Sequence, residues 1–114
     1  MKDGFRLMHA VGRASVNPPT FVNLSYNGNK DSDKWVAFIG KGVCFDAGGL
    51  NIKNADGMKN MFLDKHGACS VFSAFQAIVE EGVKVNVTCS MGFVENFLSA
   101  NSYRPSDILS LIHI

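Results

Sequence analysis

The chain of 114 residues (12.4 kDa) is long enough for one domain of ordinary size with a modest hydrophobic core. Its 11 Lys and Arg residues nearly balance its 10 Asp and Glu residues, which argues against a protein that binds nucleic acid through the phosphate backbone. The 46% hydrophobic content argues against disorder, and no apolar run approaches the roughly 20 residues needed to span a bilayer.

The N-terminal residues lack the apolar core of a secretory signal, so we expect a cytoplasmic protein that contacts neither membranes nor nucleic acid. The three cysteines, Cys44, Cys69 and Cys89, are an odd number and form no C-x-x-C pair. We expect them to be buried, reduced thiols that serve in packing.

The first half of the chain predicts a helix end followed by two strands. Residues 5–13 resemble the last turn of a helix, and the prolines of residues 17–19 forbid its continuation. Residues 20–26 alternate between apolar and polar side chains, which is typical of a half-buried strand. The continuous apolar run at residues 35–39 suits a strand that is buried on both faces and ends at Gly40.

The second half predicts a glycine-punctuated loop at residues 40–57 and an amphipathic helix over residues 65–81. A further strand is expected at residues 84–93, followed by a polar loop at residues 95–107. Strand, loop, helix and strand in this order form a βαβ unit. We therefore predict an α/β fold with a mostly parallel sheet flanked by helices.

Four charged residues cluster around the carboxyl end of the predicted buried strand. Lys41 follows this strand, Asp46 and Lys53 come next, and Asp64 stands just before the helix. Because sites in open α/β sheets form outside the carboxyl ends of strands, these side chains are expected to converge. Two carboxylates and a neutral lysine can hold divalent metal ions, which polarise a carbonyl group and activate water. The competing interpretation is that each is a solvated surface charge.

A phosphate-binding loop is excluded at the same place. A Walker A loop requires Ser or Thr directly after Gly-Lys, whereas Gly42 follows Lys41 here. The βαβ unit is therefore not predicted to bind nucleotides.

Several segments resemble the leucyl aminopeptidase (cytosol aminopeptidase) family. The segment Gly40-Lys41-Gly42-Val43-Cys44-Phe45-Asp46-Ala47-Gly48-Gly49-Leu50-Asn51-Ile52-Lys53 is similar to the family pattern G-K-G-[IV]-x-F-D-[ST]-G-G-x-x-[IL]-K. The similarity continues in six further segments: residues 11–15, residues 18–19, residues 61–64, residues 67–68, Glu95-Asn96 and residues 101–108. It covers residues 5–108 in total, and the spacing of its charged residues is highly specific.

The resemblance implies a dinuclear metallo-exopeptidase that removes the N-terminal residue, often leucine, from peptides. By position, Lys41, Asp46 and Asp64 would be metal ligands, and Asp46 would bridge both ions. The two ions would be zinc or manganese, and magnesium is a further candidate. Lys53 would be catalytic, since its charge would stabilise the negative charge developing on the scissile carbonyl. Met61 matches a position of the pocket for the N-terminal side chain, although plain core packing is an equal alternative.

The chain also departs from the family. Lys65 and His66 stand where the family commonly has Met followed by Gly or Ser, and we do not expect His66 to be a ligand. Ala47 replaces Ser or Thr, and Ser106 replaces Gly. The family segment N-T-D-A-E-G-R, which supplies further acidic ligands and the arginine that holds bicarbonate, falls downstream of this chain. We therefore expect an incomplete catalytic domain that is inactive alone and part of a homo-hexamer when full length.

Two further expectations concern the ends and an alternative function. Residues 109–114 equal the translation, in one frame, of a common transposase sequencing adapter, so we expect a library scar there and peptidase sequence in residues 1–108. The alternative is a non-catalytic relative that serves as a structural or interaction subunit. Lys65 and His66 favour it, whereas the retention of all four charged residues argues against it.

Overall fold

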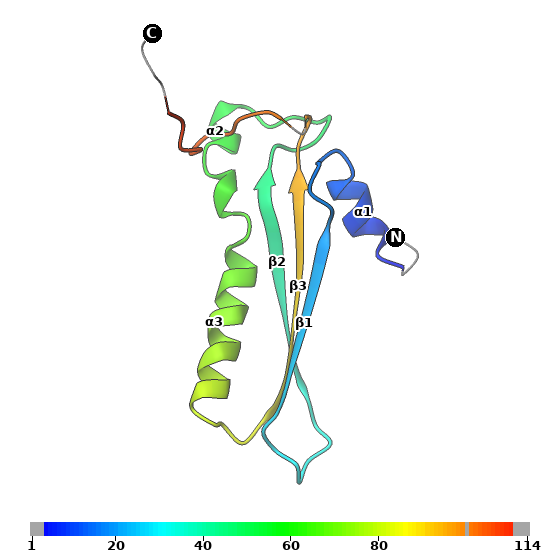
Figure 1. Cartoon of the computed structure of the whole chain (residues 1–114), viewed down its shortest axis with the longest axis vertical. Helices are drawn as coiled ribbons and strands as arrows, with labels where there is room; N and C mark the ends of the chain where they lie inside the picture. Colours follow the sequence, from blue (N-terminus) through cyan, green and yellow to red (C-terminus); the bar gives the residue numbers. More distant parts are fainter. Residues whose placement is uncertain (1–3, 100, 111–114) are drawn as a thin grey trace.

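The computed structural model describes residues 4–99 and 101–110, which form a three-stranded sheet with helices beside it (Figure 1). The elements, in chain order, are α1 (Arg6–Gly12), β1 (Thr20–Asn27), β2 (Val36–Asp46), α2 (Ala55–Met58), the 3-10 helix η1 (Met61–Leu63), α3 (His66–Glu80) and β3 (Asn86–Asn96). No helix in these two ranges is long and apolar enough to cross a bilayer. Of the predicted library scar, residues 111–114 lie outside the described ranges, and the scar stays a prediction.

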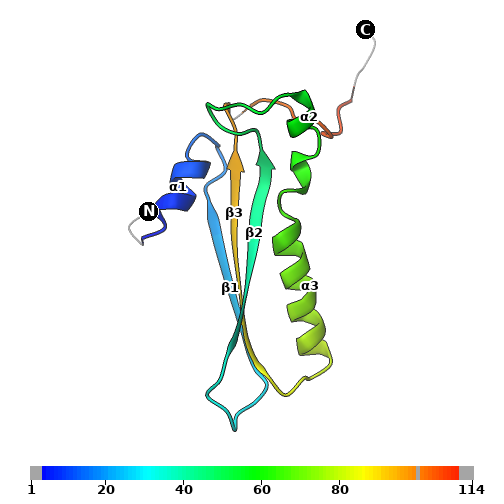
Figure 2. The same ribbon diagram turned by 180° about the vertical axis from the view of Figure 1, so that it is seen from behind.

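The strand order is β1-β3-β2, so β3 lies in the centre of the sheet. β2 and β3 are parallel and are joined through α3, which confirms the predicted βαβ unit and the α/β class. β1 pairs with β3 in the antiparallel direction, so the described sheet is mixed. Figure 2 shows the long helix α3 running beside β2, with α1 on the other side of the sheet.

The main core lies between the sheet and α3. Alternate residues of β3, Val87, Cys89 and Met91, point to the same face and pack against Ala68 and Phe75 of α3. The expectation of buried packing cysteines is therefore confirmed for Cys89.

The same expectation is wrong for Cys69, which is exposed because it lies on a side of α3 that the described residues leave uncovered. Cys44 is only half-buried. Burial raises the pKa of the Cys44 thiol more than the charge of Lys65 lowers it, so this thiol stays protonated at neutral pH.

Strand β2 is longer than predicted. We expected it to end at Gly40, but it continues through Lys41 to Asp46. Gly40 is instead the point of closest approach of α3, since a Cβ atom there would lie 2.6 Å from Cα of Ala68 and 2.5 Å from Cγ2 of Val71. Strand β3 likewise continues to Asn96, so Glu95 belongs to a strand and not to a loop.

A β-bulge at Cys44 decides which way the charged residues of β2 face. Lys41 pairs with Gly92 and Asp46 with Asn96, whereas Cys44 has no partner. Lys41 and Asp46 are thus an odd number of residues apart in β2, but their partners in β3 are an even number apart. Because paired residues share a face, the extra residue places both side chains on one face of the sheet.

The segment predicted as one glycine-punctuated loop, residues 40–57, contains the end of β2, a shorter loop and the start of α2. Asn54 caps α2, since its Oδ1 accepts a hydrogen bond of 2.8 Å from the Gly57 N–H. Beyond α2, Met61 and Phe62 of η1 pack with Met58 against a second buried cluster formed by Phe45, Ala47 and Phe97. This cluster fixes η1 beside the end of β2, and thereby positions Asp64.

Candidate metal centre

The first half of the candidate centre is the pair formed by Lys41 and Asp64. Nζ of Lys41 lies 3.1 Å from Oδ2 of Asp64. The Lys41 side chain is 62% exposed and the Asp64 side chain only 20%. Oδ2 is buried and accepts no hydrogen bond from any described residue, although the lysine lies at ion-pair distance. A buried carboxylate oxygen without a hydrogen bond is costly, so this oxygen is suited to a cation.

The second half is the pair formed by Asp46 and Lys53. Nζ of Lys53 lies 3.2 Å from Oδ2 of Asp46. The other oxygen, Oδ1, accepts hydrogen bonds of 2.6 Å from Nδ2 of Asn96 and 3.0 Å from the Gly48 N–H. Burial alone raises the pKa of Asp46, but the donors on Asn96, Gly48 and Lys53 together lower it below its ordinary value. Asp46 is therefore a carboxylate that is ionised and already held in place.

Two glycines bring Lys53 back to Asp46. Gly48 and Gly49 have φ angles of 94° and 72°, in the left-handed region that favours glycine. A Cβ atom on Gly48 would also lie 2.5 Å from the Asn51 carbonyl oxygen. The loop closes with a hydrogen bond of 3.0 Å from the Lys53 N–H to the Ala47 carbonyl. The paired glycines thus allow the reversal of the chain that forms the Asp46–Lys53 pair.

The two departures beside Asp64, Lys65 and His66, form local hydrogen bonds. The Lys65 ammonium donates to the Phe62 carbonyl and, over 3.0 Å, to the carbonyl of the bulge residue Cys44. It therefore satisfies a backbone group that the bulge leaves without a strand partner. His66 is exposed, and its Nδ1 lies 2.9 Å from the Leu63 carbonyl oxygen. Both side chains are engaged with backbone carbonyls next to the centre.

Met61 is half-buried and packs against the cluster of Phe45, Ala47 and Phe97. This contact agrees with the packing interpretation, while its role in a pocket for the N-terminal side chain stays a prediction. Ser106 has a φ of 74°, so the chain places a serine where the left-handed backbone favours the family's glycine.

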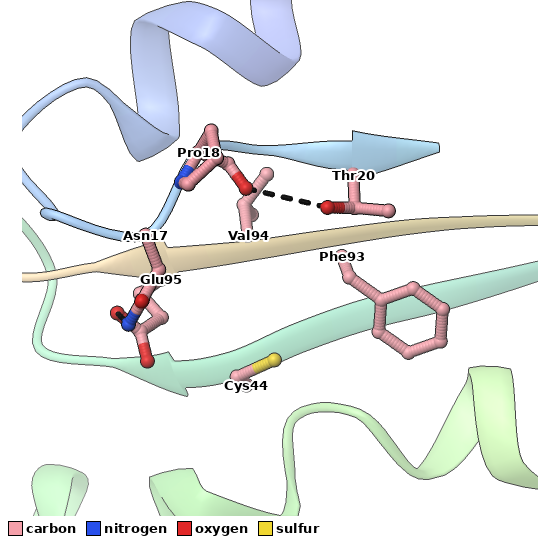
Figure 3. A pocket seen from close by; sticks show the side chains of 7 residues that line it. All are labelled: Asn17, Pro18, Thr20, Cys44, Phe93, Val94 and Glu95. Carbon is pink, nitrogen blue, oxygen red and sulfur yellow. Dashed lines mark hydrogen bonds between the residues drawn. The ribbon is translucent and has the colours of Figure 1, made fainter. Parts of the chain in front are cut away.

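A separate hollow of about 250 Å³ lies between the start of β1 and the ends of β2 and β3 (Figure 3). Figure 3 shows Cys44 and Glu95 at its walls, and none of the five predicted site residues lines it. Glu95 accepts hydrogen bonds from Oγ of Ser15 and, over 3.1 Å, from Nδ2 of Asn17, and its Oε1 lies 3.5 Å from Nη1 of Arg104. Glu95 therefore ties the chain before β1 to the end of β3.

The described residues fit part of a metal coordination shell. They supply two carboxylates, one with a buried oxygen that lacks a hydrogen bond, and the lysine amine of residue 41. Within residues 4–99 and 101–110, no three His, Cys, Asp or Glu side chains come together as a complete metal site. Each carboxylate is instead neutralised by a lysine ammonium at the place where a cation would bind.

Sequence reasoning identified Lys41, Asp46, Lys53 and Asp64, and the structure joins them in two pairs. The sequence did not indicate that Asn96 is a hydrogen-bond partner of Asp46. Asn96 lies in the Glu95-Asn96 segment that resembles the family, but this resemblance does not reveal the contact.

Comparison with known proteins identifies the family of the chain. The model of the cytosol aminopeptidase family, catalytic domain, matches residues 1–113. A "Probable cytosol aminopeptidase" of Sulfurihydrogenibium sp. is 46% identical over 108 residues, which cover 95% of this chain and 21% of that protein. The chain thus spans about a fifth of the length of the curated relatives it matches.

Solved structures agree with this match. The Caenorhabditis elegans leucine aminopeptidase superposes with a TM-score of 0.75 at 38% identity, covering 88% of this chain and 20% of that one. The bottromycin maturation enzyme BotP in complex with Mn gives a TM-score of 0.72 at 35% identity, covering 88% and 21%. From the family match and these structures together, the chain belongs to the cytosol aminopeptidase family and lies within its catalytic domain.

Proposed function

We propose that the protein containing this chain is a metal-dependent aminopeptidase that removes N-terminal residues, leucine among them, from peptides. The observation that carries the proposal is the pair of carboxylates, Asp46 and Asp64, each held against a lysine, in a chain of this family. Two divalent ions are proposed as cofactors. Zinc and manganese are the first candidates and magnesium the third, since oxygen ligands with one amine accept all three.

Lys41, Asp46 and Asp64 would hold the ions, with Asp46 shared between them. Bound there, divalent ions would polarise the scissile carbonyl and activate a water molecule. Lys41 must lose its proton to act as a ligand, since an ammonium has no lone pair. The buried Oδ2 of Asp64, which accepts no hydrogen bond from the described residues and faces Lys41, and the unprotonated Asp46 carboxylate support this assignment.

Lys53 is proposed to act on the substrate. Its side chain is one-third exposed, and its ammonium lies against Oδ2 of Asp46, the oxygen for which it competes with a cation. The Lys53 ammonium would face the scissile carbonyl, where it would stabilise the negative charge that develops in the transition state. Met61 is proposed to contact the N-terminal side chain of the peptide.

The test uses the full-length protein, reconstituted with Mn²⁺ or Zn²⁺, and a leucine-terminated peptide offered with a free or an acetylated N-terminus. We expect hydrolysis of the free form only. Lys53→Ala should lower kcat by about 10²–10³-fold, the usual cost of losing one charge-stabilising group. The matched control is Lys59→Ala, an exposed lysine of the neighbouring segment, which should retain activity.

Equal cleavage of both peptides would contradict an aminopeptidase, and full activity of Lys53→Ala would contradict the role of Lys53. The absence of any hydrolysis by the metal-loaded protein would favour the non-catalytic alternative. That alternative rested on Lys65 and His66, which have local hydrogen-bond partners instead.

The remaining expectations stay proposals and rest on the family. They are a cytoplasmic location, assembly as a homo-hexamer, and a bicarbonate ion held by an arginine outside this chain. Light scattering of the full-length protein in solution tests the hexamer.

A further inference from the structure

We propose that Asn96 is a positioning residue, which fixes the orientation of the Asp46 carboxylate and reserves its Oδ2 atom for a metal ion. The inference rests on the proposed function, because it assigns Asp46 to the metal centre. It concerns a residue outside the predicted set of Lys41, Asp46, Lys53, Met61 and Asp64.

Asn96 contacts the Asp46 segment through two hydrogen bonds, one made by its side chain and one by its backbone. Nδ2 of Asn96 donates a hydrogen bond of 2.6 Å to Oδ1 of Asp46. The backbone carbonyl of Asn96 accepts a hydrogen bond of 2.9 Å from the N–H of Ala47, the residue after Asp46. Asp46 and Asn96 are also register partners in the parallel ladder, so their side chains share a face. Asn96 therefore holds both the backbone and the side chain of Asp46.

The amide decides which carboxylate oxygen remains available. Oδ1 of Asp46 receives two N–H donors, from Asn96 and from Gly48, whereas among the described residues Oδ2 has only the Lys53 ammonium as a polar partner. An ammonium on a flexible side chain is readily displaced, but a backbone N–H and a seated amide are not. A cation that competes for Asp46 therefore meets Oδ2 as the open position.

Asn96 is itself held from two sides. A Cβ atom on Gly49 would lie 3.4 Å from Oδ1 of Asn96, so the glycine turn packs directly over the amide. Glu95, which precedes Asn96, is fixed by its contacts with Ser15, Asn17 and Arg104. The end of β3 is thus anchored on the side away from Asp46, which makes Asn96 a fixed donor.

Outer partners that orient a metal ligand typically affect metal affinity by 10–100-fold. Replacing Asn96 with Ala removes the donor, and replacing it with Leu removes the donor while keeping a similar shape. We expect both variants to bind metal about 10–100-fold more weakly, because the Asp46 carboxylate is then free to rotate.

The experiment measures Mn²⁺ affinity of the full-length protein by electron paramagnetic resonance of the unbound ion, together with the melting temperature without metal. The matched control is Asn51→Ala, an exposed asparagine of the loop that carries Lys53. We expect Asn96→Ala and Asn96→Leu to weaken binding and Asn51→Ala to leave it unchanged. If folded Asn96→Ala and Asn96→Leu proteins bind Mn²⁺ as tightly as the parent, the positioning role is overturned and the proposed function stands. If the parent protein does not bind Mn²⁺ or Zn²⁺, the proposed function itself fails.

A crystal structure of the unmodified protein with Mn²⁺ tests the inference independently of how the variants fold. We expect the ion on Oδ2 of Asp46 and the Asn96 amide still on Oδ1. An ion on Oδ1, with the Asn96 amide displaced, would overturn the proposal.

Discussion

Because α3 approaches β2 closely at Gly40, we predict that Gly40→Ala destabilises the packing of α3 against β2. Gly40 is buried within a strand, and the neighbouring atoms leave no room for a side chain at this position. The added Cβ atom would lie 2.6 Å from Cα of Ala68 and 2.9 Å from the Gly67 carbonyl oxygen. Both are backbone atoms, so no side-chain rotation relieves the overlap. Ordinary carbon contacts are at about 3.5 Å, so the start of α3 must move away by roughly 1 Å.

Overpacking of this kind costs about 1–3 kcal/mol, which is roughly a 5- to 150-fold change in an opening equilibrium. Hydrogen exchange of the full-length protein, followed by mass spectrometry, should therefore speed up by that factor in peptides that cover α3 and β2. Because Asp64 lies just before α3, metal content should also fall.

The matched control is Ser70→Ala, an exposed position of the same helix, which should leave exchange within a few-fold of the parent. Unchanged protection in Gly40→Ala would refute the argument that this glycine exists to admit α3.

Three further predictions concern other parts of the fold. Ser106→Gly should raise the stability of the protein by about 1 kcal/mol, because it relieves a left-handed backbone at a non-glycine residue, and a lower melting temperature would contradict this. Asn86→Ala should cost about 1–3 kcal/mol and expose residues 28–35 to proteolysis, since the buried Asn86 amide donates to three carbonyls of that loop, at residues 29, 32 and 34. The hydrogen bonds from Arg104 lower the pKa of Asp107, so the stability from this pair is present above the unfolded pKa of about 3.9 and is lost as the pH falls through the folded value. An NMR titration that places the Asp107 midpoint at or above 3.9 would disprove the last prediction.

Much of the fold follows from local sequence patterns. The helical spacing of apolar residues at 65–81 and the apolar run at 35–39 predicted α3 and the first part of β2. The expectation that this run is buried on both faces is wrong, since Trp35, Val36 and Ile39 are exposed. The reason is that β2 lies at the edge of the described sheet. The extension of β2 through Lys41 was missed because glycine and lysine are poor strand formers, and their place here depends on contacts with Ala68 and Val71. Such contacts between distant segments leave no local signal.

The candidate site was predicted as a set of residues but not as a geometry. Strand alternation alone would place Lys41 and Asp46 on opposite faces, and only the bulge at Cys44 brings them to the same face. The carbonyl of Cys44 accepts a hydrogen bond from Lys65, and the carboxylate of Asp46 accepts one from Asn96. A bulge and its hydrogen bonds are set by tertiary structure, so a pattern of residue types does not predict them.

The most direct test of the account is a crystal structure of the full-length protein with Mn²⁺, analysed by anomalous scattering. We expect an ion within about 2.5 Å of carboxylate oxygens of Asp46 and Asp64 and of Nζ of Lys41, with Lys53 turned away from Asp46. An ion bound elsewhere, with the Lys41–Asp64 and Lys53–Asp46 pairs intact, would contradict the claim that these residues form a metal centre.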